Sequence, residues 1–144
     1  MNNQVIEEKT GNILISTDRK KLNYDFIHSF LTCCYWCEGI SKENVIKGAE
    51  NSLSVGVYLN GEQVGFCRIV SDYIRFAYLM DVFIIEEHRG KGLSKLMMNF
   101  IMSLPGFKSC KWLLATRDAH GLYEQFGFKP LLKPERFMVK EAAV

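Results

Sequence analysis

The chain has 144 residues, of which 48% are hydrophobic and 24% charged, and its formal net charge is +2. This composition excludes a disordered chain, and the length suits one domain over residues 1–144 better than two domains of ordinary size. The near-balanced charge predicts no nucleic-acid partner, and no apolar run reaches the ~18 residues that a membrane span needs. The polar start, MNNQVIEEKTGN, also lacks the apolar core of a signal peptide. We therefore expect a cytoplasmic protein without a membrane partner.

The first elements in the chain are predicted to be a short strand and two helices. Ile13–Ser16 is an apolar run that favours a strand. Apolar side chains recur at helical spacing over residues 24–34, and Asn23 or Asp25 is available as the N-cap. Ser41 can cap a second helix. Two short helices should therefore follow the first strand.

A hairpin and a long buried strand come next. Apolar residues alternate with others over residues 53–59 and resume over 64–70, and the intervening Asn60-Gly61 is a dipeptide that type I′ turns prefer. Residues 76–85 are nearly all apolar, as expected for a strand that is covered on both faces.

The last third of the chain alternates between helix and strand. We expect a helix over 93–104, a strand over 110–115, a short helix around residues 122–126 and a closing strand over 136–140. Asp118 can cap the short helix, and Gly127 suits its C-terminal end. The predicted fold is a mixed α/β domain, with antiparallel strands first and a strand–loop–helix–strand unit in the middle.

The five cysteines do not form a pattern typical of disulfide-rich proteins. Their number is odd, and Cys33, Cys34 and Cys37 lie close together in a segment of helical periodicity. Cys34-Tyr-Trp-Cys37 has the spacing of redox and zinc sites, but it does not follow a strand, and no second pair of this kind completes a tetrahedral zinc site. The sequence therefore predicts reduced, buried thiols and no metal site.

A loop rich in glycine and cations, EEHRGKGLSK, joins the long strand to the next helix. The first backbone N–H groups of a helix bind anions, and Gly90 and Gly92 let this backbone approach a phosphate closely. Arg89, Lys91 and Lys95 add positive charge, which favours a pyrophosphate. A tight turn with solvated cations remains the alternative.

The residues of this loop do not match either of two well-known phosphate-binding loops. A Walker A loop requires a glycine–lysine pair before Ser or Thr, whereas Ser94 precedes Lys95 here. A dinucleotide-binding loop requires a third glycine at the position of Lys95.

The loop instead resembles the acyl-coenzyme A loop of the GNAT superfamily of N-acetyltransferases, whose pattern is Arg/Gln-x-x-Gly-x-Gly/Ala. Arg89, Gly92 and Ser94 occupy its positions, with serine replacing the usual small residue. The downstream segment LLATRDAHGLYEQFGF resembles that family's strand, short helix and L-Y-x-x-x-G-F signature, carried by Leu122, Tyr123, Gly127 and Phe128. The order of elements agrees from Ile13 to about Lys140.

The resemblance implies a GNAT-type fold and acetyl-CoA as the acyl donor. Such a fold has a mostly antiparallel central sheet flanked by helices, with splayed middle strands that form the acetyl-CoA cleft. By position in the family pattern, the residues expected to bind the donor are Val82, Phe83 and Ile84, through their backbone, and Arg89, Gly90, Lys91, Gly92, Leu93, Ser94 and Lys95. Thr116 stands where the family often has an asparagine that helps to hold the cofactor arm.

The implied reaction is direct attack of a neutral amine on the thioester, and it poses two proton-transfer problems. A primary amine with a pKa of ~10.4 must lose a proton before it attacks. Asp81 is the first candidate for the base, because a carboxylate inside an apolar strand is costly unless it is paired or functional; pairing with a buried donor is its alternative role. Asp72 and Glu86 are weaker candidates. Tyr123 matches the family tyrosine beside the coenzyme sulfur and can protonate the departing thiolate.

The acceptor is predicted to bind near the two N-terminal helices, where Tyr35 and Trp36 lie. These aromatics could equally belong to the core. The favoured function is an acetyl-CoA dependent N-acetyltransferase acting on a small-molecule or protein amine. The alternative is a non-catalytic module that senses acyl-CoA or binds a partner. Similar proteins are often dimers, so a homodimer is left open.

Overall fold

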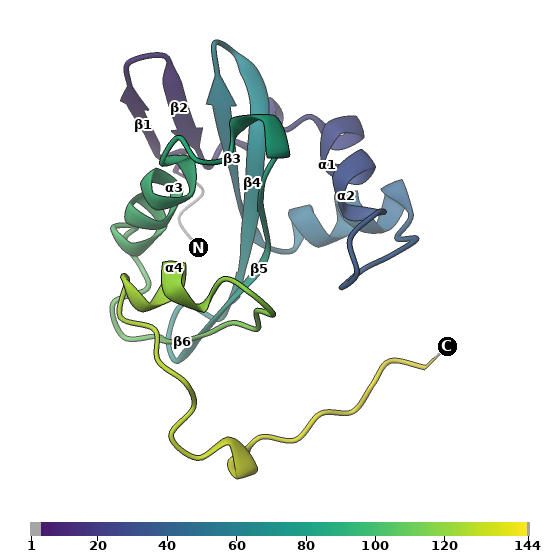
Figure 1. Ribbon diagram of the computed structural model, residues 1–144, viewed down its shortest axis with the longest axis vertical. Helices are drawn as coiled ribbons and strands as arrows, with labels where there is room; N and C mark the ends of the chain where they lie inside the picture. The colour runs from purple at the N-terminus through teal and green to yellow at the C-terminus, as the bar shows by residue number, and fades with distance from the viewer. Residues whose placement is uncertain (1–3, 144) are drawn as a thin grey trace.

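The computed structural model describes residues 4–143, so the ends of the predicted domain, residues 1–3 and 144, lie outside the described part. Its centre is a six-stranded sheet in sequence order (Figure 1). The strands are β1 (Glu7–Thr10), β2 (Ile13–Ser16), β3 (Leu53–Leu59), β4 (Glu62–Ser71), β5 (Phe76–Ile84) and β6 (Lys111–Leu113). All neighbours are antiparallel except β5 and β6, which are parallel. The predicted mixed, mostly antiparallel sheet is confirmed.

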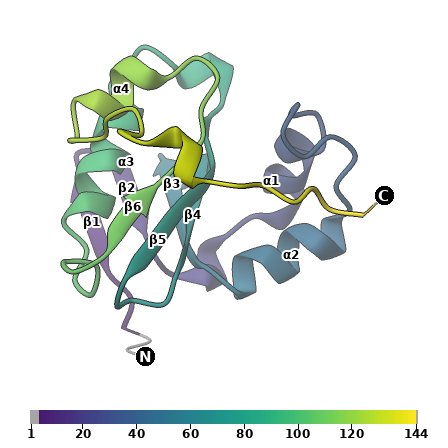
Figure 2. The same cartoon turned by 90° about the horizontal axis from the view of Figure 1, so that it is seen from below.

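Two pairs of helices cover the two faces of this sheet (Figures 1 and 2). α1 (Tyr24–Leu31) and α2 (Lys42–Glu50) lie on one face, and α3 (Leu93–Met102) and α4 (His120–Glu124) lie on the other. The short 3-10 helices are η1 (Arg19–Lys21), η2 (Glu86–His88) and η3 (Pro134–Arg136). Each face has its own apolar core, because alternate side chains of a strand point to opposite sides. Phe66 and Phe83 pack with α1 and α2, whereas Cys67 and Ile84 pack with α3.

Several local predictions are confirmed by the backbone and by the caps. Asn23 and Ser41 accept hydrogen bonds from the third residues of α1 and α2, as N-caps do. Asn60 and Gly61 both have positive φ angles, as a type I′ turn requires. Gly127 also has a positive φ and follows the end of α4.

Other local predictions are wrong. The first helix ends at Leu31, so the three clustered cysteines lie in turns instead of a helix. β1 was not predicted, because its sequence, EEKT, has no apolar alternation. Asp118 does not cap α4; the Thr116 hydroxyl accepts the N–H of Ala119 at 3.0 Å instead. Residues 137–140 extend away from the sheet without pairing, so the closing strand predicted over 136–140 is absent.

Candidate active site

A gap opens between β5 and β6. The two strands pair only over Phe76–Tyr78 and Lys111–Leu113. From Leu79 to Ile84, β5 continues to pair with β4, but within residues 4–143 no strand lies on its other side. Backbone N–H and C=O groups along this side can therefore accept another extended chain, as the free edge of a sheet does.

A β-bulge bends β5 beside the gap. Between the pairs Arg68–Met80 and Phe66–Phe83, two residues of β5 oppose one residue of β4. One of the two, Asp81, has a φ of 55°, in the left-handed region that few non-glycine residues adopt. The extra residue reverses the alternation of side chains along the strand. Bulges are over-represented beside active sites, where they redirect side chains.

The carboxylate of Asp81 is held by two donors. Arg68 Nε donates to Oδ2 at 2.6 Å, and Trp36 Nε1 donates to Oδ1 at 2.9 Å. The side chains of Asp81 and Arg68 are only 7% and 18% exposed, so this is a largely buried ion pair. Arg68 also donates to Ser52 Oγ at 3.0 Å. Asp81 thus joins the turn after α1 to the bulged part of the sheet.

The glycine loop leads from the gap to the N-terminus of α3. Gly90 and Gly92 have φ angles of 78° and 79°, which glycine adopts without a steric cost. Gly92 is the N-cap of α3, and no side chain caps the helix there. A Cβ atom at either glycine would meet no heavy atom within 4 Å. The first N–H groups of this ten-residue helix therefore lie beside open space, where an anion can approach them.

The cations of the loop have different local roles. Arg89 Nε donates to the carbonyl oxygen of Ile84 at 2.9 Å, which ties the loop to the end of β5. Lys91 Nζ lies 3.2 Å from Nδ1 of His88, and both Lys91 and Lys95 are exposed. Two cations therefore remain near the helix N-terminus for a ligand, while the third stabilises the loop.

The other residues expected to bind the donor divide between core and surface. Phe83 stacks on Phe30 with a centroid distance of 3.9 Å, and Ile84 is buried against α3. Val82 and Ser94 are half-buried, whereas Leu93 is buried and anchors the first turn of α3. Side chains of β5 therefore pack in the cores, while the edge of its backbone faces the gap.

Tyr123 lies on α4 and is 8% exposed. Its ring packs edge-on against Phe128, with the ring centroids 5.9 Å apart. Burial raises the pKa of Tyr123 to about 12, and repulsion between its phenolate and the ionised forms of Cys67, Asp118 and Tyr35 adds to the effect. The phenol therefore keeps its proton throughout the physiological pH range.

Tyr35 and Trp36 are not core residues. They are 55% and 44% exposed and pack edge to face, with the ring centroids 5.1 Å apart. The guanidinium of Arg117 lies 4.0 Å from the centroid of the Tyr35 ring. The turn after α1 and the loop after β6 thus meet, although they follow elements on opposite sides of the gap.

Of the two weaker candidates for the base, Asp72 has a structural role. Asp72 Oδ1 accepts the N–H groups of Ile74, Arg75 and Phe76 at 2.9–3.0 Å, and these bonds lower the pKa of its carboxyl group. Asp72 therefore builds the β4–β5 turn. Glu86, the other weaker candidate for the base, is exposed in η2.

The five cysteines differ in exposure and in how readily they ionise. All five lie within the described residues and are free thiols. Burial raises the pKa of Cys34 and brings that of Cys37 to about 11, which disfavours their reactive thiolates. Cys33, by contrast, is exposed, so the prediction of buried thiols is wrong for it. Over residues 4–143, no group of three His, Cys, Asp or Glu side chains could hold a metal ion.

The described helices include none with the length and apolar character that a membrane span requires.

Comparison with known proteins identifies the family. The family model described as "Acetyltransferase (GNAT) domain" matches residues 50–130, which include β5, the glycine loop, α3 and α4. The chain belongs to the GNAT acetyltransferase family. Its enzyme class is that of an N-acetyltransferase, as the sequence predicted. Members of this family generally use acetyl-CoA, and their acceptors are generally amines.

Individual relatives agree with this membership. A crystal structure of a "putative acetyltransferase belonging to the gnat family" from Xanthomonas campestris is 39% identical, with a TM-score of 0.88 over 93% of this chain and 96% of that chain. A Gibberella zeae protein described as a "putative acetyltransferase" is 28% identical, over 83% of this chain and 80% of that protein. The ribosomal-protein-S18-alanine N-acetyltransferase of Escherichia coli shares 18% identity and a TM-score of 0.65, over 81% of this chain and 77% of that one, which is a likeness of fold.

Sequence reasoning missed two residues of the site. Arg68 gives a detectable signal, because a cation within the apolar strand segment VGFCRIV needs a partner, and Asp81 in the next strand supplies one. Arg117 gives none, because a cation in a polar loop is ordinarily solvated and only the fold brings it to Tyr35.

Proposed function

We propose that residues 1–144 form one catalytic domain that transfers the acetyl group of acetyl-CoA to a primary amine of a small molecule or protein, by direct attack on the thioester. The observation that carries this proposal is that the β5–β6 gap leads to the uncapped N-terminus of α3. The extended amide arm of acetyl-CoA would lie in the gap, and its pyrophosphate would lie at the helix N-terminus that follows. Five free thiols favour a reducing compartment such as the cytoplasm.

The residues present fit this donor. The space where a Cβ of Gly90 or Gly92 would lie is open, so backbone N–H groups can approach the phosphate oxygens closely. Lys91 and Lys95 supply charge beside them. The free backbone edge of Val82–Ile84 can bind the amide arm of the donor as another strand would.

We assign Tyr123 to stabilising the leaving group, which is the thiolate of coenzyme A. The donor supplies the thioester that the amine attacks. A phenol with a pKa of about 12 stays protonated, so its O–H can donate to sulfur as negative charge develops there. Complete proton transfer to a thiolate with a pKa of roughly 8.5 would be uphill. We therefore assign Tyr123 to stabilising the departing thiolate with a hydrogen bond, followed by proton transfer that solvent completes.

Asp81 is assigned to positioning, which is one of the two roles that the sequence leaves open for it. Each of its oxygens already accepts a hydrogen bond, and Arg68 neutralises its charge. Both oxygens therefore have partners on the protein, which favours a positioning role over direct contact with the amine. On this proposal Asp81 fixes Trp36 and the bulge, and the amine loses its proton to water before it attacks.

We assign binding of the acceptor amine to the surface formed by the exposed rings of Tyr35 and Trp36. Their exposure is unusual for large aromatics and supports a binding surface. The Asp81 hydrogen bond fixes the indole ring, so this surface is partly ordered before a ligand arrives.

Two measurements test the proposal in order. Thermal unfolding is measured with acetyl-CoA, coenzyme A, NAD and ATP. A ligand at a hundred times its Kd adds ~2.7 kcal/mol, which should raise Tm by roughly 8–11 °C for the two coenzyme A compounds alone. Thiol release is then measured with a panel of amines. Tyr123→Phe should lower kcat by about 10²-fold and leave the Kd of acetyl-CoA unchanged. Binding without turnover on any amine would favour the non-catalytic module, and no binding would remove both functions.

A further inference from the structure

The guanidinium of Arg117 has hydrogen-bond donors without a partner. It lies 4.0 Å from the centroid of the Tyr35 ring, and Arg117 is exposed. Within residues 4–143 its side chain makes no hydrogen bond and no ion pair, although Asp118 follows it in the chain. Stacking on a ring uses the face of the guanidinium and leaves the N–H groups at its edge free. An arginine in this state can bind a planar anion through two parallel hydrogen bonds.

The polar groups of the neighbouring network are, by contrast, already paired. Trp36 Nε1 donates to Asp81, and Asp81 also accepts from Arg68. Arg68 donates further to Ser52. The charges of Asp81 and Arg68 therefore cancel, and Arg117 adds a positive charge that this network does not neutralise. A single positive charge matches a carboxylate better than a phosphate monoester, which carries a charge of about −1.5 to −2 at pH 7.

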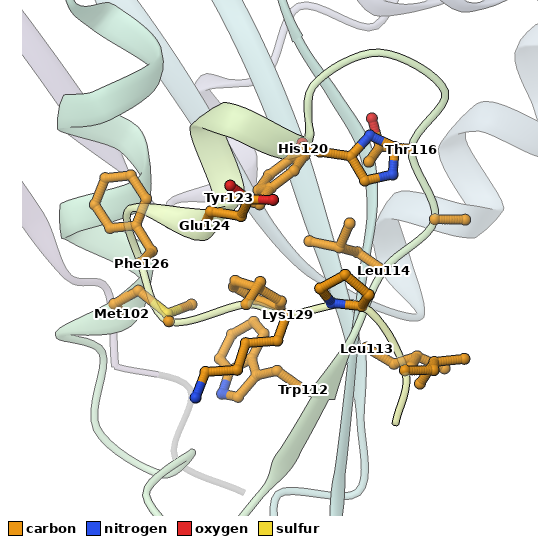
Figure 3. A pocket seen from close by; sticks show the side chains of 15 residues that line it. Met102, Trp112, Leu113, Leu114, Thr116, His120, Tyr123, Glu124, Phe126 and Lys129 are labelled. Atoms are coloured by element: carbon orange, nitrogen blue, oxygen red, sulfur yellow. The ribbon is translucent and has the colours of Figure 1, made fainter. Parts of the chain in front are cut away.

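Arg117 also lies close to the place proposed for the departing sulfur. It follows Thr116, which lines the same groove as Tyr123 (Figure 3). Its partner Tyr35 is near enough to Tyr123 for the two ionised phenols to repel each other, which contributes to the raised pKa of Tyr123. An anion bound by Arg117 would therefore lie on the acceptor side of the site and a short distance from the reacting groups.

The two exposed rings supply the rest of the surface. Tyr35 and Trp36 pack edge to face, with their centroids 5.1 Å apart, and the hydrogen bond to Asp81 fixes the indole ring. The face of an aromatic ring attracts an ammonium group and also packs against a methylene chain. The surface therefore suits a small molecule with a protonated amine at one end and a carboxylate at the other.

We propose that the acceptor is a small primary amine that carries a carboxylate a few bonds from its nitrogen, and that Arg117 binds this carboxylate. The chain between the carboxylate and the amine packs on Tyr35 and Trp36. Arg117 is then a specificity-determining residue, because it contacts the acceptor and takes no part in proton transfer. The identity of this molecule as the acceptor rests on the proposed function, whereas the binding of its carboxylate does not.

Two other interpretations of Arg117 make different predictions. A solvated arginine that only stacks on Tyr35 would not distinguish a charged ligand from a neutral one. An arginine that holds the donor would change the Kd of acetyl-CoA when it is replaced.

Matched ligands test the proposal. Glycylglycine and glycylglycinamide differ in the carboxylate alone, and β-alanine and β-alaninamide form a second pair with a shorter spacer. Titration by nuclear magnetic resonance gives each Kd for the whole protein saturated with coenzyme A, so that no acetyl transfer intervenes. Shifts of the indole N–H signal of Trp36 locate the ligand. In at least one pair the carboxylate should bind roughly 10-fold more tightly, near the lower limit for a hydrogen bond to a charged group, because the guanidinium is exposed.

Variants of Arg117 assign the preference. Arg117→Gln should bring the ratio of the two Kd values to about one, and Arg117→Lys should give an intermediate ratio, because lysine keeps the charge but lacks the planar fork. Arg75→Gln is the matched control. Arg75 is also exposed, but its carbonyl oxygen accepts the N–H of Lys111 at the start of β6, whereas Arg117 follows the end of that strand. This control should keep the wild-type ratio.

Equal affinity within both pairs, no binding of either carboxylate, or a preference that Arg117→Gln leaves intact would overturn the proposal. A higher Kd of acetyl-CoA in Arg117→Gln would overturn it too, because the arginine would then hold the donor. The same ligands are also tested as substrates with acetyl-CoA. Turnover of amines without any preference for a carboxylate would refute this inference and leave the proposed reaction intact. Binding of the carboxylates without turnover of any amine would favour the non-catalytic module and leave the role of Arg117 intact.

Discussion

Replacement of Gly92 by alanine, compared with the same change at Gly11, separates backbone strain from ligand binding. Gly92 has a φ of 79° and Gly11 a φ of 60°, and an added Cβ meets nothing within 4 Å at either position. An alanine in the left-handed region costs about 1–2 kcal/mol. For a domain of this size, 1 kcal/mol lowers Tm by roughly 3–4 °C, so both variants should unfold roughly 3–8 °C below wild type.

Only Gly92→Ala should weaken the binding of acetyl-CoA. Its methyl group would enter the open space at the N-terminus of α3, where a phosphate needs close contact with backbone N–H groups. Loss of one hydrogen bond to a charged group costs about 1.5–3 kcal/mol, which raises the Kd roughly 10- to 150-fold. Titration calorimetry gives the Kd, and scanning calorimetry gives Tm. Equal Kd values for the two alanine variants would refute the placement of the pyrophosphate at this helix.

Three further predictions follow from the site. Asp81→Asn should lower the free energy of unfolding in urea by roughly 1–3 kcal/mol, because Arg68 loses its counter-charge. The acidic limb of the pH–rate profile should persist in this variant. Disappearance of that limb would identify Asp81 as the base. Tyr35→Ala should raise the KM of the acceptor amine and leave the Kd of acetyl-CoA unchanged, and an equal rise in both would contradict the assignment of Tyr35 to the acceptor side. The pKa of Tyr123 is raised from 10 to about 12, so the contribution of its phenol to stability is complete below pH ~10 and is lost as the pH rises towards 12. Over this pH range the midpoint of urea unfolding should fall less in Tyr123→Phe than in wild type. An equal fall in both proteins would contradict a buried phenol.

The helix and strand predictions succeeded where the signal is local. The caps at Asn23 and Ser41 and the turn at Asn60-Gly61 depend on hydrogen bonds or φ preferences within a few residues, so the letters specify them. Predictions failed where distant partners decide. β1 is polar and becomes a strand only because β2 lies beside it.

The candidate site shows the same division. The glycine loop and the position of Tyr123 are visible in the sequence, because both belong to short motifs. The geometry at Asp81 is not visible: a cation in an apolar strand signals only that Arg68 needs a partner, whereas the bulge that turns the Asp81 carboxylate towards Arg68 and Trp36 depends on the register of β4 and β5. The contact between Arg117 and Tyr35 joins residues 82 positions apart, and only the folded chain brings them together.

By itself the sequence determined the order of most elements, the loop before α3 and the resemblance to the GNAT family, because these depend on periodicity and on residues close together in the chain. The tertiary structure alone decided where β5 leaves β6, which edge of the sheet is open and what faces the gap. Strand pairing between distant segments sets these features. The pattern at residues 136–140 shows the limit most clearly: its letters predict a strand, but a strand needs a neighbour, and within one chain residues 137–140 have none.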